Sequence, residues 1–404
     1  MIKGNKVKNS RKKKTLGIIL GFEALIVAGL FLMVVIKGDI SFHTIDAMES
    51  ITGNENLQTD SGNEGKEGTG QSGAVDADPR ENTGEDAGRA DSSEKPETIP
   101  EDVYDTITIS AAGDVTLGRD HSYGYEKSFD HELEIRDMDY GYFLRNVKSI
   151  FEEDDITIVN LETTLTTAET KANKKFRFKA DPSYVEILKQ GDIEAVSIAN
   201  NHTRDYLEQG YQDTLKNLEK AEIGYFGYEH RYIQEVRGIR VGLAGFTVWE
   251  AAEKQKEEIR QAIEALKAEG ADIVILMFHW GIERDYYPNS VQTKLAHYSI
   301  DQGADLVLGG HPHVLQGIEE YNGKSIIYSL GNFSFGGNKN PSDKDSMVYV
   351  HRFNFRNGEL ISQENEAIPC SISSVKERNN YQPTPLEGSE KERVLDKIAK
   401  LSRF

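Results

Sequence analysis

Two histidines flank a proline in the stretch GGHPHVLQG, residues 309–317, directly after the apolar run ADLVL. A Gly-Gly pair after a buried strand predicts a tight turn in which the backbone closely approaches another group. Pro312 restricts the backbone between His311 and His313, so their imidazoles are held in a set relation. Because histidine is the commonest metal ligand, the pair is a candidate metal motif. The alternative is an exposed loop with two unrelated histidines, and residues elsewhere in the chain decide between the two.

Other residues of ligand type lie at the ends of four further strand-like runs. They are, in chain order, Asp114 after TITISAAG, Glu162 with Asn160 at the end of ITIVNLE, Asn201 and His202 after EAVSIAN, and His279 after DIVILMF. In open α/β sheets, binding sites form beyond the carboxyl ends of the strands, so these side chains are expected to converge. Placement at five strand ends therefore favours one shared site over five unrelated loops.

This set of carboxylate, amide and imidazole groups predicts a site for a divalent metal. A ligand set without thiolate suits Mn, Fe or Zn. The set is large enough for two ions. Together, two ions can generate a hydroxide and bind both the attacking and the leaving group of a displacement reaction. His202 is the candidate catalytic imidazole, since an imidazole just outside the ligand set can protonate a leaving group. Arg119 and Arg204 are candidate substrate-binding residues that contact an anion.

The elements that must position these residues alternate between short apolar runs and helical stretches from Thr106 onward. The runs are rich in β-branched residues and bounded by turn residues, which is typical of strands. Helices are expected at 206–222 and 253–270, the second ending at Gly270. Apolar strands alternating with helices indicate an α/β layered fold. Because residues 324–372 are strand-rich, the sheet is expected to be mixed or doubled.

The N-terminal part of the chain has the pattern of a membrane anchor. A basic tail, residues 1–15, precedes an apolar stretch, residues 16–36, whose only charge is Glu23. About 20 apolar residues span a bilayer core, and no Ala-x-Ala cleavage site follows, so a transmembrane signal anchor is predicted. The positive-inside rule places the N-terminus in the cytoplasm and the main domain outside the cell membrane.

Composition predicts the remaining boundaries. Residues 37–105 are rich in Gly, Ser, Asn, Asp and Glu and are expected to form a disordered acidic linker. This segment carries much of the net charge of −20, and the sequence lacks the basic footprint of a nucleic-acid binder. A single cysteine, Cys370, excludes a disulfide framework. The folded domain is expected over 106–372, and a tail with a short amphipathic helix over 373–404 either docks on it or meets a partner.

Six motifs resemble, in this order, those of the capsule-synthesis CapA family: GDVTLGR, NLETTLT, SIANNHTRDY, FHWGIE, GGHPHVLQG and YSLGNFSF. That family is associated with bacterial poly-γ-glutamate production and is similar to calcineurin-like metallophosphatases. The resemblance covers about residues 106–372. It implies a four-layer α/β sandwich, metallophosphatase-like, with a two-metal site and an N-terminal transmembrane helix.

The resemblance also implies a role for each matching residue. Asp114 would bind the first metal, Glu162 would bridge, and Asn201 would bind the second metal. His202 would be the catalytic imidazole, and the remaining metal ligands would be His279, His311 and His313.

Two positions depart from the metallophosphatase pattern. Thr116 stands where that pattern has a histidine ligand, and Glu162 stands where it has an aspartate. A mononuclear site or a purely structural metal is therefore the alternative to two catalytic ions.

The function that the resemblance implies is that of a membrane-anchored protein of poly-γ-glutamate capsule synthesis or export, with a metal-dependent hydrolase-like site. Its expected partners are the bilayer, membrane subunits of the synthase, and poly-γ-glutamate or another anionic substrate. Two alternatives are a non-catalytic polymer-binding or scaffold subunit and a general surface metallophosphoesterase. Replacement of His202 separates catalysis from scaffolding.

Overall fold

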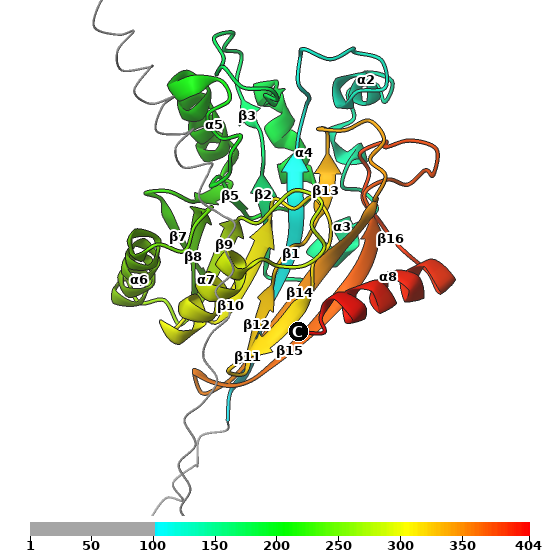
Figure 1. Ribbon diagram of the computed structural model, residues 1–404. Coiled ribbons are helices and arrows are strands. Elements are labelled where there is room, and N and C mark those ends of the chain that lie inside the picture. The colour runs from blue at the N-terminus through cyan, green and yellow to red at the C-terminus, as the bar shows by residue number, and fades with distance from the viewer. Residues whose placement is uncertain (1–101) are drawn as a thin grey trace, which may run out of the picture. The chain divides into compact units, whose positions relative to one another are not determined.

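The computed structural model describes residues 102–404, which form a mixed α/β fold with two large mixed sheets and one two-stranded sheet (Figure 1). The predicted α/β class, with sheets that are both mixed and doubled, is confirmed. The expected basic tail, the expected anchor and nearly all of the expected linker lie outside the described residues. Within residues 102–404, no helix is long and apolar enough to cross a bilayer.

The first large sheet has eight strands. Its order is β16 (Thr384–Pro385), β15 (Glu359–Ser371), β14 (Asp345–Arg356), β1 (Tyr104–Thr116), β2 (Ile156–Leu161), β5 (Ala195–Ser197) and β6 (Gly224–Phe226), with β13 (Asn332–Phe335) beside the end of β1. The strands from β1 to β6 run parallel to one another, whereas β14, β15 and β16 are antiparallel to their neighbours. The sheet thus joins a parallel half that ends in polar residues to an antiparallel half.

The second large sheet has six strands. Its order is β11 (Ile318–Tyr321), β12 (Lys324–Ile327), β10 (Leu306–Gly310), β9 (Ile273–His279), β8 (Ile239–Thr247) and β7 (Arg231–Val236). Its four central strands are parallel and its two edge strands antiparallel. A short parallel pair, β3 (Thr164–Leu165) and β4 (Lys179–Ala180), forms the third sheet.

Helices lie between the strands along the chain, and the last helix follows the last strand. They are α2 (Phe129–Glu134), α3 (Lys148–Phe151), α4 (Val185–Gln190), α5 (Leu207–Ala221), α6 (Glu253–Ala268), α7 (Ser290–Asp301) and α8 (Gly388–Leu401), with short 3-10 turns at Tyr140–Tyr142 and Pro182–Tyr184. Helices α5 and α6 confirm the two predicted helices. Gly270 follows the end of α6 with a φ of 87°, the left-handed conformation that favours glycine there.

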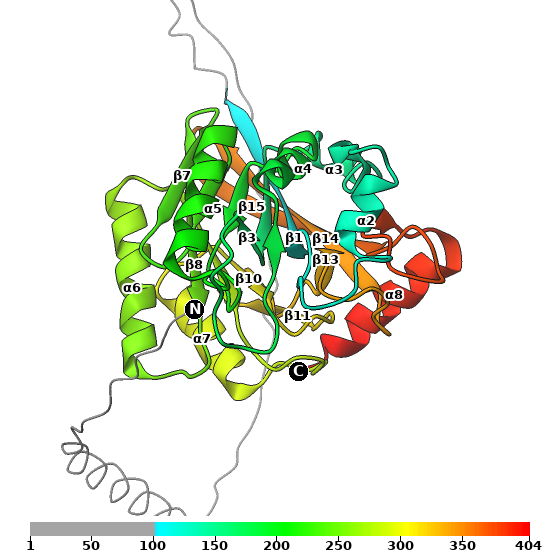
Figure 2. The ribbon, with the colours of Figure 1, turned by 90° about the horizontal axis from the view of Figure 1, so that it is seen from above.

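Three apolar clusters show how these elements pack. One lies between the two large sheets and includes Ile109, Ile158, Ile275 and Leu308. A second covers the other face of the first sheet beneath α4 and α5, and a third covers the other face of the second sheet beneath α6 and α7. Seen from above, α6 and α7 lie along one side of the molecule and α8 along another (Figure 2). Because both faces are covered, all six residues of β2 are buried, including the polar Thr157 and Asn160.

The C-terminal segment docks on the domain. Helix α8 buries Val394, Ile398 and Leu401, and the first two join the cluster between the sheets. Tyr381, in the loop before it, is fully buried. Of the two expectations for the tail, docking on the domain is therefore the one observed.

The parallel strands of both sheets end at the same place, which we call the site end. His311, the residue after β10, donates its backbone N–H to Oδ2 of Asp114 in β1 at 3.3 Å. The two sheets thus bring their terminal polar residues together, as expected for parallel strands.

Candidate metal centre

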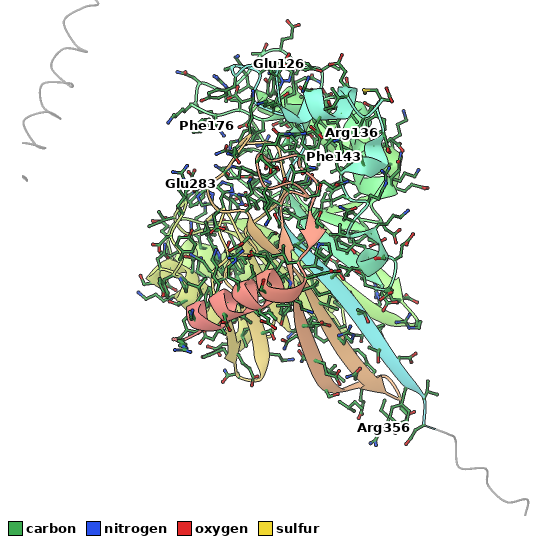
Figure 3. The ribbon with its side chains drawn as sticks, turned by 90° about the vertical axis from the view of Figure 1, so that its right-hand side faces the viewer. Glu126, Arg136, Phe143, Phe176, Glu283 and Arg356 are labelled. Carbon is green, nitrogen blue, oxygen red and sulfur yellow. The ribbon has the colours of Figure 1, made fainter. Side chains whose placement is uncertain are left out.

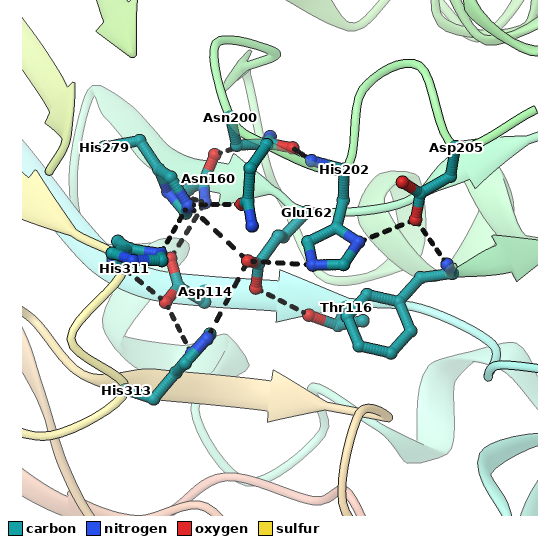
Figure 4. Close-up of polar contacts among 12 residues, drawn as sticks. Asp114, Thr116, Asn160, Glu162, Asn200, His202, Asp205, His279, His311 and His313 are labelled. Atoms are coloured by element: carbon teal, nitrogen blue, oxygen red, sulfur yellow. Dashed lines mark hydrogen bonds and ion pairs between the residues drawn. The ribbon is translucent and has the colours of Figure 1, made fainter. Parts of the chain in front are cut away.

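The structure joins seven of the nine predicted site residues in one polar network at the site end (Figure 4). They are Asp114, Glu162, Asn201, His202, His279, His311 and His313. Three of them, Glu162, His311 and His313, present ligand atoms that all lie within 4.8 Å of one another. The convergence expected from the strand ends is therefore present.

Asp114 is held rigidly near the end of β1. Its backbone N–H donates to Gly331 O at 2.9 Å, and Asn160, its register partner on β2, donates Nδ2 to Oδ1 at 2.8 Å. The other carboxylate oxygen, Oδ2, lies 3.2 Å from Nδ1 of His313. A Cβ on Gly113 would lie 1.9 Å from Gly331 O, so this close strand approach requires glycine.

The GGHPH motif is built differently from the predicted tight turn. Gly309 and Gly310 are the last two residues of strand β10, and the turn falls on the histidines, with φ of 93° at His311 and 58° at His313. The predicted close approach is present, because a Cβ on Gly310 would lie 2.8 Å from Asp114 Oδ1. Left-handed backbone conformations at non-glycine residues cost conformational free energy, and such residues are often found at functional sites.

Glu162 has one satisfied and one unsatisfied carboxylate oxygen. Oε2 accepts a hydrogen bond from Thr116 Oγ1 at 3.1 Å. Oε1 is buried and has no hydrogen-bond partner. It faces Nε2 of three imidazoles, at 3.6 Å from His279 and at 3.9 Å from both His202 and His313 (Figure 4). A buried carboxylate oxygen without a partner is unfavourable, and a cation among these groups would remove the penalty.

The two departures from the metallophosphatase pattern contact each other. Thr116 and Glu162 form the hydrogen bond just described. The threonine hydroxyl thus holds one carboxylate oxygen of Glu162, whose side chain is longer than the aspartate of the metallophosphatase pattern, and the other oxygen is directed at the imidazoles. The donor set of carboxylates, an amide oxygen and imidazoles therefore fits a hard or borderline divalent ion.

Electrostatics favour the neutral, ligand form of two of the imidazoles, His279 and His311, and the protonated form of His313. Burial lowers the pKa of His279 well below its usual value and that of His311 to about 4, so both rings are neutral at neutral pH, as metal binding requires. Burial, followed by the charge of Asp114, raises the pKa of Glu162 to about 8. Burial opposes the charged form of His313, but the charge of Glu162 and the hydrogen bond to Asp114 raise its pKa to about 9.

His202 belongs to a separate dyad beside this cluster. Its Nδ1 lies 2.6 Å from Oδ2 of Asp205, a fully buried carboxylate, and its Nε2 faces Glu162. The ring of Phe178 packs against the imidazole with a centroid distance of 4.2 Å. Asp205 and Phe178 together fix the ring with Nε2 toward the metal ligands.

Three further residues contact the site and were not among the predicted ones. Oδ1 of Asn332 lies 2.9 Å from His313 Nδ1, and the motif YSLGNFSF contained this signal. Trp249, about half exposed, lies with its ring 4.7 Å from that of His311. Lys174 donates Nζ to Asn201 O at 2.7 Å and lies 2.5 Å from Asp205 Oδ1. No spacing in the sequence singles out Trp249 or Lys174.

The two arginines predicted to bind an anion instead pair with carboxylates outside the metal cluster. Arg119 donates Nε to Asp130 Oδ2 at 2.8 Å. Arg204 pairs with Glu208 and lies over the ring of Tyr211 at 4.0 Å. Neither contacts the metal cluster, and their assignment as substrate-binding residues stays a prediction.

Comparison with known proteins identifies the family. Residues 108–337 match the family model described as bacterial capsule synthesis protein PGA_cap. The chain belongs to the PGA_cap family. The resemblance to the capsule-synthesis CapA family that the six motifs indicated is confirmed. The matched segment contains every side chain of the metal cluster, whereas α8 of this PGA_cap protein lies beyond it.

Relatives of this PGA_cap protein carry related names. The PGA biosynthesis protein CapA of Bacillus subtilis is 32% identical over 288 residues, which cover 66% of this chain and 72% of that protein. The capsule biosynthesis protein CapA of Bacillus anthracis is 30% identical over 274 residues, which cover 61% and 64%. A crystal structure of a hypothetical protein from Thermus thermophilus aligns with a TM-score of 0.42 at 18% identity, over 65% of this chain and 99% of that one.

Proposed function

We propose that this PGA_cap protein is a membrane-anchored, extracytoplasmic component of poly-γ-glutamate capsule synthesis or export, with a metal-dependent hydrolase-like site. Family membership and the names of the two Bacillus relatives support the capsule process. The apolar stretch at 16–36 after a basic tail supports the anchor. Helices outside two facing sheets agree with a four-layer, metallophosphatase-like sandwich.

The unsatisfied oxygen of Glu162, facing three imidazoles, is the observation that carries the proposed metal site. The residues that would hold the metal are Asp114, Glu162, Asn201, His279, His311 and His313. We propose two divalent ions of Mn, Fe or Zn. When bound, they would supply Lewis acidity and positive charge at the site end.

His202 would supply the proton for the leaving group. Asp205 bonds Nδ1, so the tautomer and orientation of the ring are fixed and Nε2 is the nitrogen that faces a bound substrate. The buried charge of Asp205 stabilises the ring when it is protonated. This arrangement suits hydrolysis or transfer at a phosphoester or an amide.

Complementation of a strain that lacks the gene tests the proposal. The wild-type protein should restore capsular poly-γ-glutamate, whereas the His311→Ala, His313→Ala double variant should not. His202→Ala should also fail while its purified form retains the metal content of the wild type. Full restoration by His202→Ala would favour the scaffold subunit, and undiminished polymer in the deletion strain would count against a capsule role.

A further inference from the structure

The loop that joins β3 to β4 is strongly basic in an acidic chain. Residues 171–179, KANKKFRFK, contain five Lys or Arg and no Asp or Glu, although the chain has a net charge of −20. Among the ion pairs of residues 102–404, Lys174 is the one cation of this loop that pairs with a carboxylate. The other four cations of the basic loop, as we call residues 171–179, are not neutralised in this way: Lys171, Lys175, Arg177 and Lys179.

The backbone of the basic loop is hydrogen-bonded to the dyad of His202 and Asp205. Phe178 donates its backbone N–H to Asp205 Oδ2 at 2.5 Å, and Ala172 donates its own to Asp205 O at 2.9 Å. Lys174 bonds the backbone of Asn201, and the ring of Phe178 covers His202. The backbone of the basic loop is therefore fixed beside the dyad, and Lys174 contacts it directly.

Aromatic rings accompany the exposed cations. Phe176, 39% exposed, stacks on Tyr123, 52% exposed, with a centroid distance of 6.1 Å. Lys175 Nζ lies 4.8 Å from the centre of the Phe176 ring. Arg177 is partly buried: it donates to Ser122 Oγ at 3.1 Å, and its buried Nε has no partner. In Figure 3, Phe176 lies on the same side of the molecule as Glu283, whose charge acts on His311 and His313.

We propose that the basic loop is the docking surface for an acidic γ-glutamyl polymer at this site, an inference that rests on the proposed function. Each γ-linked repeat carries one free carboxylate and two chain methylenes. The carboxylates suit the unneutralised cations, and the methylenes suit the exposed faces of Phe176 and Tyr123. Bound here, the polymer lies beside His202, with Lys174 holding the dyad in place as a positioning residue.

Binding of fluorescently labelled poly-γ-glutamate to the full-length protein in detergent tests the inference. The Lys171→Gln, Lys175→Gln variant should bind about tenfold more weakly than wild type at low salt, the loss expected for two exposed charge contacts. The difference should shrink at high salt, because salt screens exposed charges. Phe176→Ser, which leaves the charge unchanged, should also weaken binding. Lys174 is left intact because it contacts Asp205.

A matched control removes two exposed lysines elsewhere. Lys216→Gln, Lys220→Gln on α5 causes the same loss of charge and should bind as the wild type does. Equal weakening by both pairs would overturn the inference, because only net charge would matter. Preference for polyphosphate over poly-γ-glutamate would overturn it in favour of a phosphate polymer.

The proposed function is judged separately by metal content. The Lys171, Lys175 variant should keep the metal of the wild type. If it also binds polymer normally while His311→Ala, His313→Ala does not, the polymer binds the metal and the basic loop is excluded. The proposed metal site would survive that outcome.

Discussion

Nε2 of His279 lies 3.1 Å from Nδ1 of His311, so two ring nitrogens face each other across a gap that only one proton can fill. Oδ1 of Asn201 lies 2.8 Å from the same nitrogen of His279. Both rings are buried and neutral at neutral pH because burial lowers the pKa of each. Neutral imidazoles can ligate a metal, and His311 belongs with Glu162 and His313 to the group of residues that could hold one.

The first prediction concerns metal content. Full-length protein should contain close to two ions of Mn, Fe or Zn per chain by elemental mass spectrometry, and His311→Ala, His313→Ala should lose them. His297→Ala is the matched control, because this histidine pairs with Glu319 away from the site. One ion per chain in the wild type would indicate a mononuclear site. No ion after reloading with metal would contradict the proposed metal site.

The second prediction uses the unsatisfied oxygen of Glu162. In metal-free protein, Glu162→Gln should leave the melting temperature unchanged or raise it, because burial raises the pKa of Glu162 to about 8 and glutamine keeps this buried position neutral. With metal present, the variant should lack the stabilisation of the wild type, about 2.7 kcal/mol at a metal concentration one hundred times the Kd. Thermal denaturation with and without metal measures both effects, and equal metal-induced shifts in the two proteins would refute the role of Glu162.

The third prediction separates the dyad from the metal ligands. His202→Asn should lower any phosphoester or amide turnover by about 10²- to 10⁴-fold, the usual contribution of a positioned proton donor, while metal content stays constant. Asp205→Asn should also reduce turnover, because it alters the tautomer of the ring that Asp205 now fixes. Loss of metal in His202→Asn would mean that the ring is a ligand and not the acid.

The fourth prediction concerns pH and a carboxylate outside the metal site. Burial raises the pKa of Glu194 from 4.5 to about 7, so the folded protein holds a proton that the unfolded chain has released between these values. Stability from this group must therefore fall as pH rises from 4.5 to 7. Glu194→Gln should be more stable than wild type at about pH 8 and lose this advantage below about pH 4.5.

Urea denaturation across that pH range checks the sign. Thr157 donates its backbone N–H to Glu194 at 2.8 Å, and glutamine can still accept this bond. The exposed Glu222→Gln serves as control and should follow the wild type at every pH. A Glu194→Gln advantage that grew toward acidic pH would contradict the prediction.

The fifth prediction tests the docking of α8. Ile398→Ala should destabilise the protein by about 2–4 kcal/mol, because it empties a buried position between the sheets. Leu395→Ala, on the same helix but 36% exposed, should cost much less. Chemical denaturation compares the two, and equal effects would argue that α8 does not contribute to the core.

The strands and the ligands were predictable because both depend on local sequence. Apolar runs bounded by turn residues mark strands such as β9, and parallel strands bring their ends together, so the convergence of Asp114, His279 and His311 follows from pattern alone. The conformation of GGHPH was harder to predict, because close packing against Asp114 places the glycines in the strand and moves the left-handed residues onto the histidines.

Contacts between segments far apart in the chain could not be read from the sequence. Arg119 follows the predicted ligand Asp114 closely, but it is bound by Asp130 on α2. Lys174 reaches Asp205 from a loop whose path depends on the packing of Phe178 against His202. Side chains of this kind are placed by tertiary packing and leave no periodic signal.

Strand β1 has a consequence for how the domain is held. Tyr104 at its start pairs with Arg356, and Asp114 lies ten residues later, so the start of the strand and the metal cluster are separated by roughly 33 Å of extended chain. Figure 3 shows Arg356 at one extremity and Phe176 toward the other. The chain thus enters the domain at the start of β1, at the end far from the metal cluster. For the membrane-anchored protein that we propose, a change in the length of the segment before β1 would alter how far the metal cluster can lie from the bilayer without altering its chemistry.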